Sequence, residues 1–361
     1  MSILLTILVL SAVVVVHEIG HFVAARRCGI KVEEFSIGMG PRLLKLRGKE
    51  TLYSLRAFPI GGSCQMLGED EDNPDARAFN RKPVWKRIIV LVAGAVMNFL
   101  LAFCLFLVIV AFNGFRVTDV YSVVPGSPAE AAGLQTGDEI VRVNGTKVNI
   151  YMDYELALEG NEDKPIQLRI NRGGEKLTLT ITPEWSEEHE RYLLGYQRDL
   201  RIGLLEKAEA DLVEAGVRRA GVWETVSEAY HNVFFSIKVT VQGLWKLVTF
   251  QVNLGEMTGI IGIAGVIDDT YTEAVGNAQK GLTVALWNIA GLTALLSANL
   301  GVFNLLPIPA LDGARVLFAA VEGVRRKPVP PEKEGMVHFV GFVLLMILAA
   351  VIAFSDIVKL L

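Results

Sequence analysis

Apolar residues gather in four long blocks that contain few charged positions. The blocks run from Ile3 to Ala25, Ile88 to Phe112, Leu282 to Leu306 and Met336 to Phe354. At about 1.5 Å per helical residue, each is long enough to cross a hydrocarbon layer of roughly 30 Å. The pattern predicts an α-helical polytopic membrane protein with four transmembrane helices.

Shorter patterns fill the segment between the first two blocks. From Lys31 to Asp72, β-prone runs alternate with glycine-rich turns, which predicts small β-hairpins. The exposed edge of such a hairpin could pair with an unfolded substrate as an added strand, and a hairpin without a task is the alternative. The runs are Glu33 to Ile37, Leu43 to Leu46 and Thr51 to Leu55, and the turns are Gly38 to Pro41, Gly48 and Gly61-Gly62.

Residues 115 to 184 change in character, because β-prone runs and turns replace the apolar blocks. They predict a compact soluble domain of about 70 to 90 residues. The stretch from Gly126 to Gly145 contains a Gly-Leu-x-x-Gly-Asp-x-Ile core and closely resembles a PDZ domain. The predicted strands are Val117 to Val124, Glu139 to Val143, Ile166 to Ile170 and Leu177 to Ile181.

Composition agrees with a membrane protein. The chain is 52% hydrophobic and has a mean hydropathy of +0.40, which excludes an ordinary soluble domain. Its three cysteines, Cys28, Cys64 and Cys104, lie outside the predicted external domain and show no pairing pattern. We therefore expect no disulfide framework, no disulfide-linked partner and no cysteine metal site.

Charge in the loops predicts the orientation. Residues 26–87 hold 13 Lys and Arg against 8 Asp and Glu, whereas residues 113–221 hold 13 against 19. Because positive loops stay in the cytoplasm, we expect both termini and the PDZ-like domain outside it. Topology explains the basic excess, so no nucleic acid is expected. Arg26 and Arg27 follow the first block, which favours a retained helix over a signal peptide.

The first block contains a polar cluster, His17-Glu18-Ile19-Gly20-His21. Residues four apart on an α-helix differ by about 40° around the axis and about 6 Å along it, so both imidazoles can reach one ion. This is the HExxH pattern, in which two histidines bind zinc and the glutamate takes a proton from water. Ionisable groups are costly in a membrane helix, which favours a metal site over a structural polar cluster.

A catalytic zinc usually takes a third protein ligand, and Asp312 is the candidate. The third block ends in the sequence NLLPIPALDG, where Pro307 and Pro309 break the helix and free backbone groups at membrane depth. A carboxylate beside such a break can supply an oxygen ligand. Capping of the following helix is the alternative for Asp312.

Other polar positions carry weaker signals. Asn98 is the single amide of the second block, and a lone membrane asparagine usually joins helices. His189, His231 and His338 lack companions at ligand spacing, so we leave them out of the predicted site.

The segment from Val222 to Phe250 predicts an amphipathic helix on the membrane surface, because its apolar positions step by three and four. A fifth span is the alternative. An extra crossing would put Asp312 on the opposite face of the membrane from His21.

The HExxH motif, the PDZ-like insert and the NxxPxPxLDG stretch resemble, in this order, the site-2 protease family over essentially the whole chain. The closest resemblance is to bacterial regulator-of-sigma-E proteases. Members are intramembrane zinc metalloproteases that cut single-pass membrane proteins, notably anti-sigma factors and spent signal peptides. The resemblance implies one zinc per chain bound by His17, His21 and Asp312, with Glu18 as the catalytic acid and base.

The resemblance also implies substrate contacts. Asn98 and Asn304 match family asparagines that hold the substrate backbone or its oxyanion. The segment from Gly38 to Gly68 resembles a membrane-reentrant β-loop, in which Gly38, Gly40, Gly61 and Gly62 are the expected substrate-binding positions.

Two stretches depart from the family pattern. Residues 93–98 read AGAVMN where the family has AGPxxN, and residues 258–264 read TGIIGIA where the family has SGPxxIA. Both lack the proline, which affects the expected backbone shape and leaves the ligands untouched.

Four segments are expected along the chain. Residues 1–112 hold two helices and the reentrant loop at 31–72, and residues 113–205 form one extracytoplasmic α+β PDZ domain. Residues 206–280 form extracytoplasmic amphipathic helices and a linker, and residues 281–361 hold the last two helices.

The expected function is intramembrane proteolysis in the inner membrane of a bacterium, with the lipid bilayer and single-pass membrane proteins as partners. A membrane-anchored PDZ scaffold or chaperone with a vestigial metal site is the alternative from another class. A metal transporter would need polar residues along several spans, whereas the second block offers only Asn98.

Overall fold

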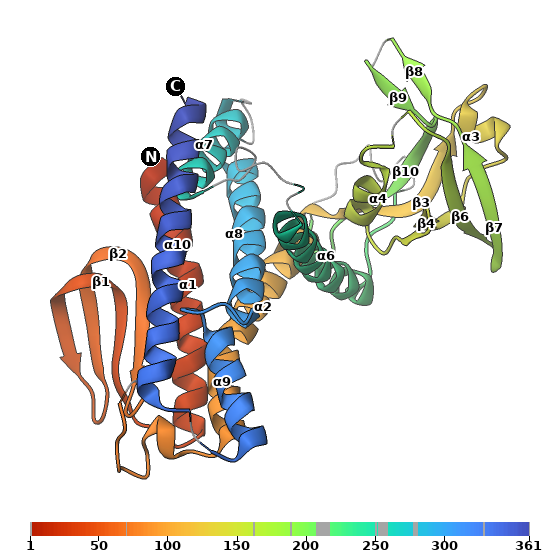
Figure 1. Cartoon of the computed structure of the whole chain (residues 1–361). Coiled ribbons are helices and arrows are strands. Elements are labelled where there is room, and N and C mark those ends of the chain that lie inside the picture. The colour runs from red at the N-terminus through yellow and green to blue at the C-terminus, as the bar shows by residue number, and fades with distance from the viewer. Residues whose placement is uncertain are drawn as a thin grey trace. The chain divides into compact units, whose positions relative to one another are not determined.

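The computed structural model describes residues 2–69, 71–161, 163–187, 190–206, 217–249, 251, 259–276, 281–327 and 329–360. Among them, four helices are long and apolar enough to cross a membrane, so the four predicted spans are confirmed as helices. The chain forms two compact units, residues 1–105 with 236–361, and residues 106–235. The four helices, shown in Figure 1, are α1 (Ser2–Arg27), α2 (Val84–Asn113), α8 (Gly281–Leu305) and α10 (Pro331–Leu360).

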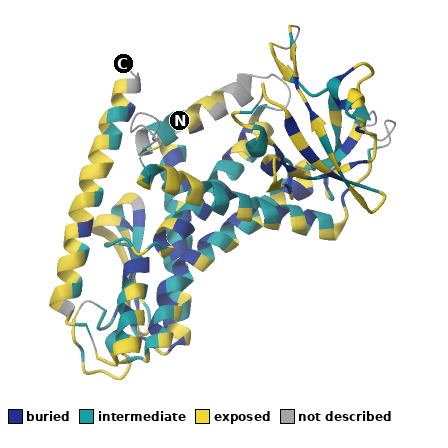
Figure 2. Cartoon of the chain, turned by 45° about the vertical axis from the view of Figure 1, so that its right-hand side comes forward, coloured by how far each residue is buried: buried dark blue, intermediate teal, exposed yellow. Residues whose placement is uncertain are grey.

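In the first unit, α1 is the shared packing partner of several elements. It contacts α8, α7 (Ile260–Gly276) and the strands β1 (Val32–Arg47) and β2 (Leu52–Met66). Helix α10 instead exposes apolar side chains along most of its length, as the yellow ribbon in Figure 2 shows. A 30-residue helix with such an apolar surface is suited to contact the hydrocarbon core of a membrane.

Helix α10 also holds the start of α7. The carboxylate of Asp356, which is 2% exposed, accepts the backbone N–H groups of Gly259 and Gly262 at 3.0 and 2.9 Å. First-turn N–H groups have no partner within their own helix, so Asp356 caps α7 from another helix. This is the stretch that lacks the family proline, and its first residue, Thr258, lies outside the described residues.

Strands β1 and β2 each turn back on themselves, so that together they form four antiparallel segments. Ile37 pairs with both Gly62 and Leu55, which places residues 32–37 between residues 62–66 and residues 52–55. Residues 42–47 pair with residues 52–56 on the outer side. The predicted hairpins are confirmed, and β2 packs against α1.

A buried carboxylate joins the segments of this sheet. Glu34, 3% exposed, accepts hydrogen bonds from the Ser54 hydroxyl at 2.6 Å, from Arg56 at 2.9 Å and from Nε of Arg42 at 3.1 Å. The Arg42 hydrogen bond, helped by Ser54 and Arg56, lowers the pKa of Glu34 to about 2 although burial acts in the opposite direction. Residues from three of the four segments therefore meet at one charged group.

We predict that Glu34→Ala loosens this sheet, because Arg56 loses its buried partner, and that Glu33→Ala does not, because Glu33 is half exposed. Amide hydrogen exchange over residues 32–66 measures the effect. Since the pKa of Glu34 is depressed, its contribution is fully present above its unfolded pKa of about 4.5 and is lost as the pH falls through about 2. Wild-type protection should therefore be the same at pH 5 and pH 7. Equal exchange in the two variants would contradict the prediction.

The second unit is built on an antiparallel sheet in the order β10-β3-β4-β6-β7, with β5 paired to β4. Ile140, Leu168 and Ile170 are fully buried at its centre. The four predicted strands are confirmed as β3, β4, β6 and β7, whereas β5, β8, β9 and β10 were not predicted. The PDZ assignment remains a prediction. The elements are β3 (Phe115–Val123), α3 (Pro128–Ala131), β4 (Glu139–Val143), β5 (Thr146–Lys147), α4 (Tyr151–Leu158), β6 (Ile166–Arg172), β7 (Glu175–Ile181), β8 (Glu184–Ser186), β9 (Arg191–Leu193) and β10 (Tyr196–Arg201).

The remaining long helix is α6 (Val222–Val248), at the position of the predicted amphipathic helix. It is not among the candidate spans of the described residues, and Phe250 lies outside those residues. Its place on the membrane surface stays a prediction.

Candidate metal centre

Helix α1 presents His17 and His21 on one face, as their spacing predicts. Their Nε2 atoms lie 3.0 Å apart, and each residue is 6% exposed. The rings meet edge to face with 4.6 Å between their centroids. Two imidazole nitrogens therefore converge on one buried point.

Asp312 joins them from the first residue of α9 (Asp312–Arg325). Its Oδ2 lies 3.0 Å from Nε2 of His17 and 3.2 Å from Nε2 of His21. Donors bound tetrahedrally to zinc at about 2.0–2.1 Å are roughly 3.3 Å apart, so the observed separations suit one zinc ion. Leu311 rather than Asp312 occupies the N-cap position of α9, which removes the capping alternative.

Glycine at position 313 lets the aspartate reach this point. A Cβ there would stand 2.1 Å from the carbonyl oxygen of Leu306. Only a residue without a side chain allows α9 to begin so close to the end of α8. The LDG motif thus carries the carboxylate that meets the two imidazoles and the glycine that places it.

Two further glycines bring α1 and α2 together behind the histidines. A Cβ on Gly94 would stand 2.5 Å from both Cε1 of His17 and Nε2 of His21, and one on Gly20 would stand 2.4 Å from the carbonyl oxygen of Ala93. The imidazoles therefore lie directly on the backbone of α2. Gly94 was not among the residues predicted for the site. The available signal was a glycine among large apolar residues, four positions before Asn98.

Hydrogen bonds at the outer ring nitrogens orient the imidazoles. Nδ1 of His21 donates to the carbonyl oxygen of Val90 at 2.9 Å, which leaves the Nε2 lone pair for a metal. Nδ1 of His17 lies 3.2 Å from the amide nitrogen of Asn98, whose amide oxygen is buried without a partner among the described residues. When that amide is turned over, its oxygen accepts a hydrogen bond from the His17 Nδ1–H and gains the partner that it lacks. The Nε2 lone pair of each histidine is then available to a zinc ion.

Asn98 is itself held firmly. It is fully buried, and the Ser297 hydroxyl of α8 donates to its backbone carbonyl at 2.8 Å. The amide therefore lies at a junction of α1, α2 and α8.

Glu18 lies beside the three donors rather than among them. Its carboxylate accepts a hydrogen bond from the backbone N–H of Cys64 in β2. Gly62 of β2 is also close to this side chain, because a Cβ added to Gly62 would stand 3.1 Å from Cγ of Glu18. The carboxylate is therefore close to both the metal donors and residues 62–66 of β2.

The other predicted substrate residues lie in different settings. Asn304 is 8% exposed near the end of α8. Gly38, Gly40 and Gly61 have φ values of 84°, 86° and 85°, so the backbone at the hairpin turns itself requires glycine. Their contact with substrate stays a prediction.

Two histidines and an aspartate around one point, with a glutamate next to them in an apolar helix, define a metallohydrolase centre of the membrane protease class. Comparison with known families agrees, because the sequence pattern of peptidase family M50 matches residues 5–348. The chain belongs to this family, the site-2 proteases, and is a zinc metalloprotease.

Individual relatives cover the chain from end to end. A Clostridium perfringens protein, provisionally named a zinc metalloprotease, is 37% identical over 358 residues, 99% of both chains. Zinc metalloprotease RasP of Geobacillus kaustophilus is 30% identical over 99% of this chain and 98% of its own. Regulator of sigma-W protease RasP of Bacillus subtilis is 28% identical over 98% and 97%. The RasP alignments run over 439 and 437 positions, so both proteins contain segments without a counterpart here.

We predict that Gly94→Ala weakens zinc binding at least about tenfold, because the added methyl group must displace a ligand imidazole. Alanine favours a helix, so α2 should still form. The matched control is Gly291→Ala in α8, where a Cβ meets nothing within 4 Å. Zinc per chain, measured after purification and after titration with a chelator, gives the result. Full zinc occupancy in Gly94→Ala would contradict the prediction.

Proposed function

We propose that this protease hydrolyses peptide bonds within the transmembrane segments of single-pass membrane proteins, with anti-sigma factors and remnant signal peptides as its substrates. The observation that carries the proposal is the convergence of His17, His21 and Asp312 at a point inside a membrane helix, with Glu18 beside it. The RasP relative named a regulator of sigma-W protease supports the substrate class.

The site lies below the membrane surface in this proposal. His21 precedes Arg26 by five residues, which puts the metal roughly 10 Å inside the boundary marked by the arginines. The positive charge of residues 26–87 assigns that boundary to the cytoplasmic side. Cleavage then releases fragments towards the cytoplasm.

Zinc bound to the three donors supplies a Lewis acid that makes water nucleophilic at neutral pH and polarises a peptide carbonyl. Glu18 takes a proton from the attacking water and delivers it to the leaving amine. The Cys64 N–H holds the Glu18 carboxylate next to the donors, where it can do both. Asn98 contacts His17, which supports a role for Asn98 in orienting that ligand. Of the two predicted asparagines, Asn304 is then the one that contacts the substrate.

Substrate enters as an extended strand in this scheme. The Cys64 N–H points to Glu18, and that of Met66 points to Glu69, so this edge of β2 faces away from its paired segment. A substrate segment added here would pass next to Glu18. The PDZ-like unit on the outer side would act as a peptide binder or a size filter.

The first test replaces Glu18 by Gln in the purified full-length protein. We expect cleavage of a single-span test substrate to fall by about 10²- to 10⁴-fold, because the proton acceptor is lost, while one zinc per chain remains. A zinc chelator should abolish wild-type cleavage, and added zinc should restore it. Wild-type rates in Glu18→Gln would overturn the assignment of Glu18 as the acid and base. Absence of cleavage of the single-span substrate by the zinc-loaded wild type would overturn the proposed cleavage within membrane spans.

A second test varies the substrate rather than the enzyme. Replacing a Leu-Leu pair in the substrate span by Gly-Gly lowers the free energy of helix unwinding by about 2 kcal/mol, so kcat/KM should rise by about 10- to 30-fold. The matched control moves the same pair to the far end of the span. Equal rates for the three substrates would show that no unwinding precedes cleavage.

A further inference from the structure

The chain between α8 and α9 makes a tight, unusual turn just before Asp312. Ile308 N–H donates to Leu306 at 2.7 Å, and Leu311 N–H donates to Ile308 at 3.1 Å. Ala310 has a φ of 76°, the left-handed region that a residue with a Cβ disfavours. Something outside the turn must therefore stabilise it.

Helix α10 supplies that support through two adjacent turns. The backbone N–H of Ala310 donates to Nδ1 of His338 at 2.9 Å. One turn further on, Gly341 lies so close to Pro309 that a Cβ there would stand 2.2 Å from the Cβ of Pro309. The turn is thus held by one hydrogen bond and one close backbone approach, both from α10.

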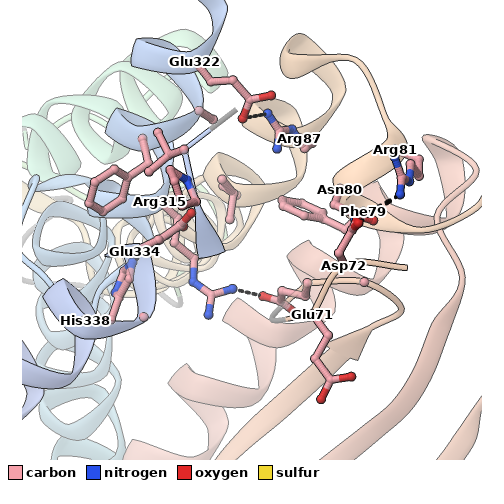
Figure 3. Close-up of a pocket in the computed structure, with 18 residues that line it drawn as sticks. Glu71, Asp72, Phe79, Asn80, Arg81, Arg87, Arg315, Glu322, Glu334 and His338 are labelled. Atoms are coloured by element: carbon pink, nitrogen blue, oxygen red, sulfur yellow. Dashed lines mark hydrogen bonds and ion pairs between the residues drawn. The ribbon is translucent and has the colours of Figure 1, made fainter. Parts of the chain in front are cut away.

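The environment of His338 fixes its ring. The Phe318 ring of α9 lies 5.9 Å away, and Nε2 lies 3.9 Å from Glu334. His338 and Glu334 both line a cleft of about 600 Å³. Figure 3 shows the two side chains next to each other. An imidazole that accepts at Nδ1 carries its proton on Nε2, on the side of the Glu334 carboxylate.

We propose that His338 is a positioning residue for the third zinc ligand. By accepting the Ala310 N–H, it keeps the left-handed turn that starts α9 and so sets where the Asp312 carboxylate meets His17 and His21. The inference rests on the three-ligand centre argued above. It gives a task to a histidine that sequence spacing had excluded.

The geometry leaves little room for drift at Asp312. Its oxygen lies 3.0 and 3.2 Å from the two imidazole nitrogens, and Ala310 is only two residues away. A change of φ at Ala310 towards the usual negative range swings the chain that follows it. The carboxylate would then leave the point on which the imidazoles converge.

The test compares two substitutions of nearly equal size in the full-length protein. In His338→Asn, the amide oxygen can stand where Nδ1 stood and accept the same N–H, whereas His338→Leu removes the acceptor. We expect zinc affinity to fall about tenfold or more in His338→Leu and to stay within about threefold of wild type in His338→Asn. Chelator competition gives the affinities, and the visible spectrum of the cobalt-substituted protein reports ligand geometry.

A second-site change separates positioning from general stability. Ala310→Gly allows the left-handed φ without a Cβ, so it should restore much of the zinc affinity of His338→Leu. His231→Leu, a histidine of α6, is the matched control and should bind zinc like the wild type. The zinc affinity of Asp312→Asn shows how far binding falls when the carboxylate ligand itself is lost.

Equal zinc affinity and cobalt spectra in His338→Leu and the wild type would overturn the proposal, as would equal losses in His338→Leu and His338→Asn. Either result would leave the protease function standing, provided that Asp312→Asn loses zinc. Absence of zinc from the wild type would instead remove the metal centre on which both depend.

Discussion

The structure depends on a carboxylate meeting two imidazoles across 295 positions of sequence. Asp312 and His17 lie 3.0 Å apart, yet one stands on the opening helix and the other begins α9. Three polar groups gathered this way inside an apolar helix layer would be costly without an ion, because each is largely removed from water. A zinc ion at this point would offset that cost, because it would replace the lost hydration with three coordinate bonds.

Glycine makes the meeting sterically feasible. Gly20 and Gly94 let α1 and α2 approach until the imidazoles lie on the backbone of α2, and Gly313 lets α9 start against the last turn of α8. Hydrogen bonds then fix the orientation of the side chains at the site. His21 is held by the Val90 carbonyl and His17 by the Asn98 amide. The Glu18 carboxylate is held by the backbone N–H of Cys64. The outer helix α10 completes the frame, with His338 at the turn before Asp312 and Asp356 at the start of α7.

Much of this could be predicted because its signals are local. A four-residue spacing puts His17 and His21 on one helical face, long apolar runs reveal four spans, and glycine-separated β-prone runs reveal the hairpins. The contacts that escaped prediction join residues far apart in sequence. His338 is hydrogen-bonded to Ala310, which lies 28 positions away in sequence, so no local spacing pattern could reveal the hydrogen bond. Gly94 looks like any helix-packing glycine until the imidazoles are placed against it, and the short strands β8 to β10 follow no alternation strong enough to mark them.

X-ray absorption at the zinc edge of the purified wild-type protein is the most direct measurement of the centre. Two imidazole nitrogens and one carboxylate oxygen predict a first shell of nitrogen and oxygen only, at about 2.0–2.1 Å, with imidazole scattering from two rings. In the Asp312→Asn protein, the shell should lose its carboxylate or the zinc itself. A sulfur neighbour at about 2.3 Å, or a spectrum unchanged by Asp312→Asn, would contradict the three-ligand centre.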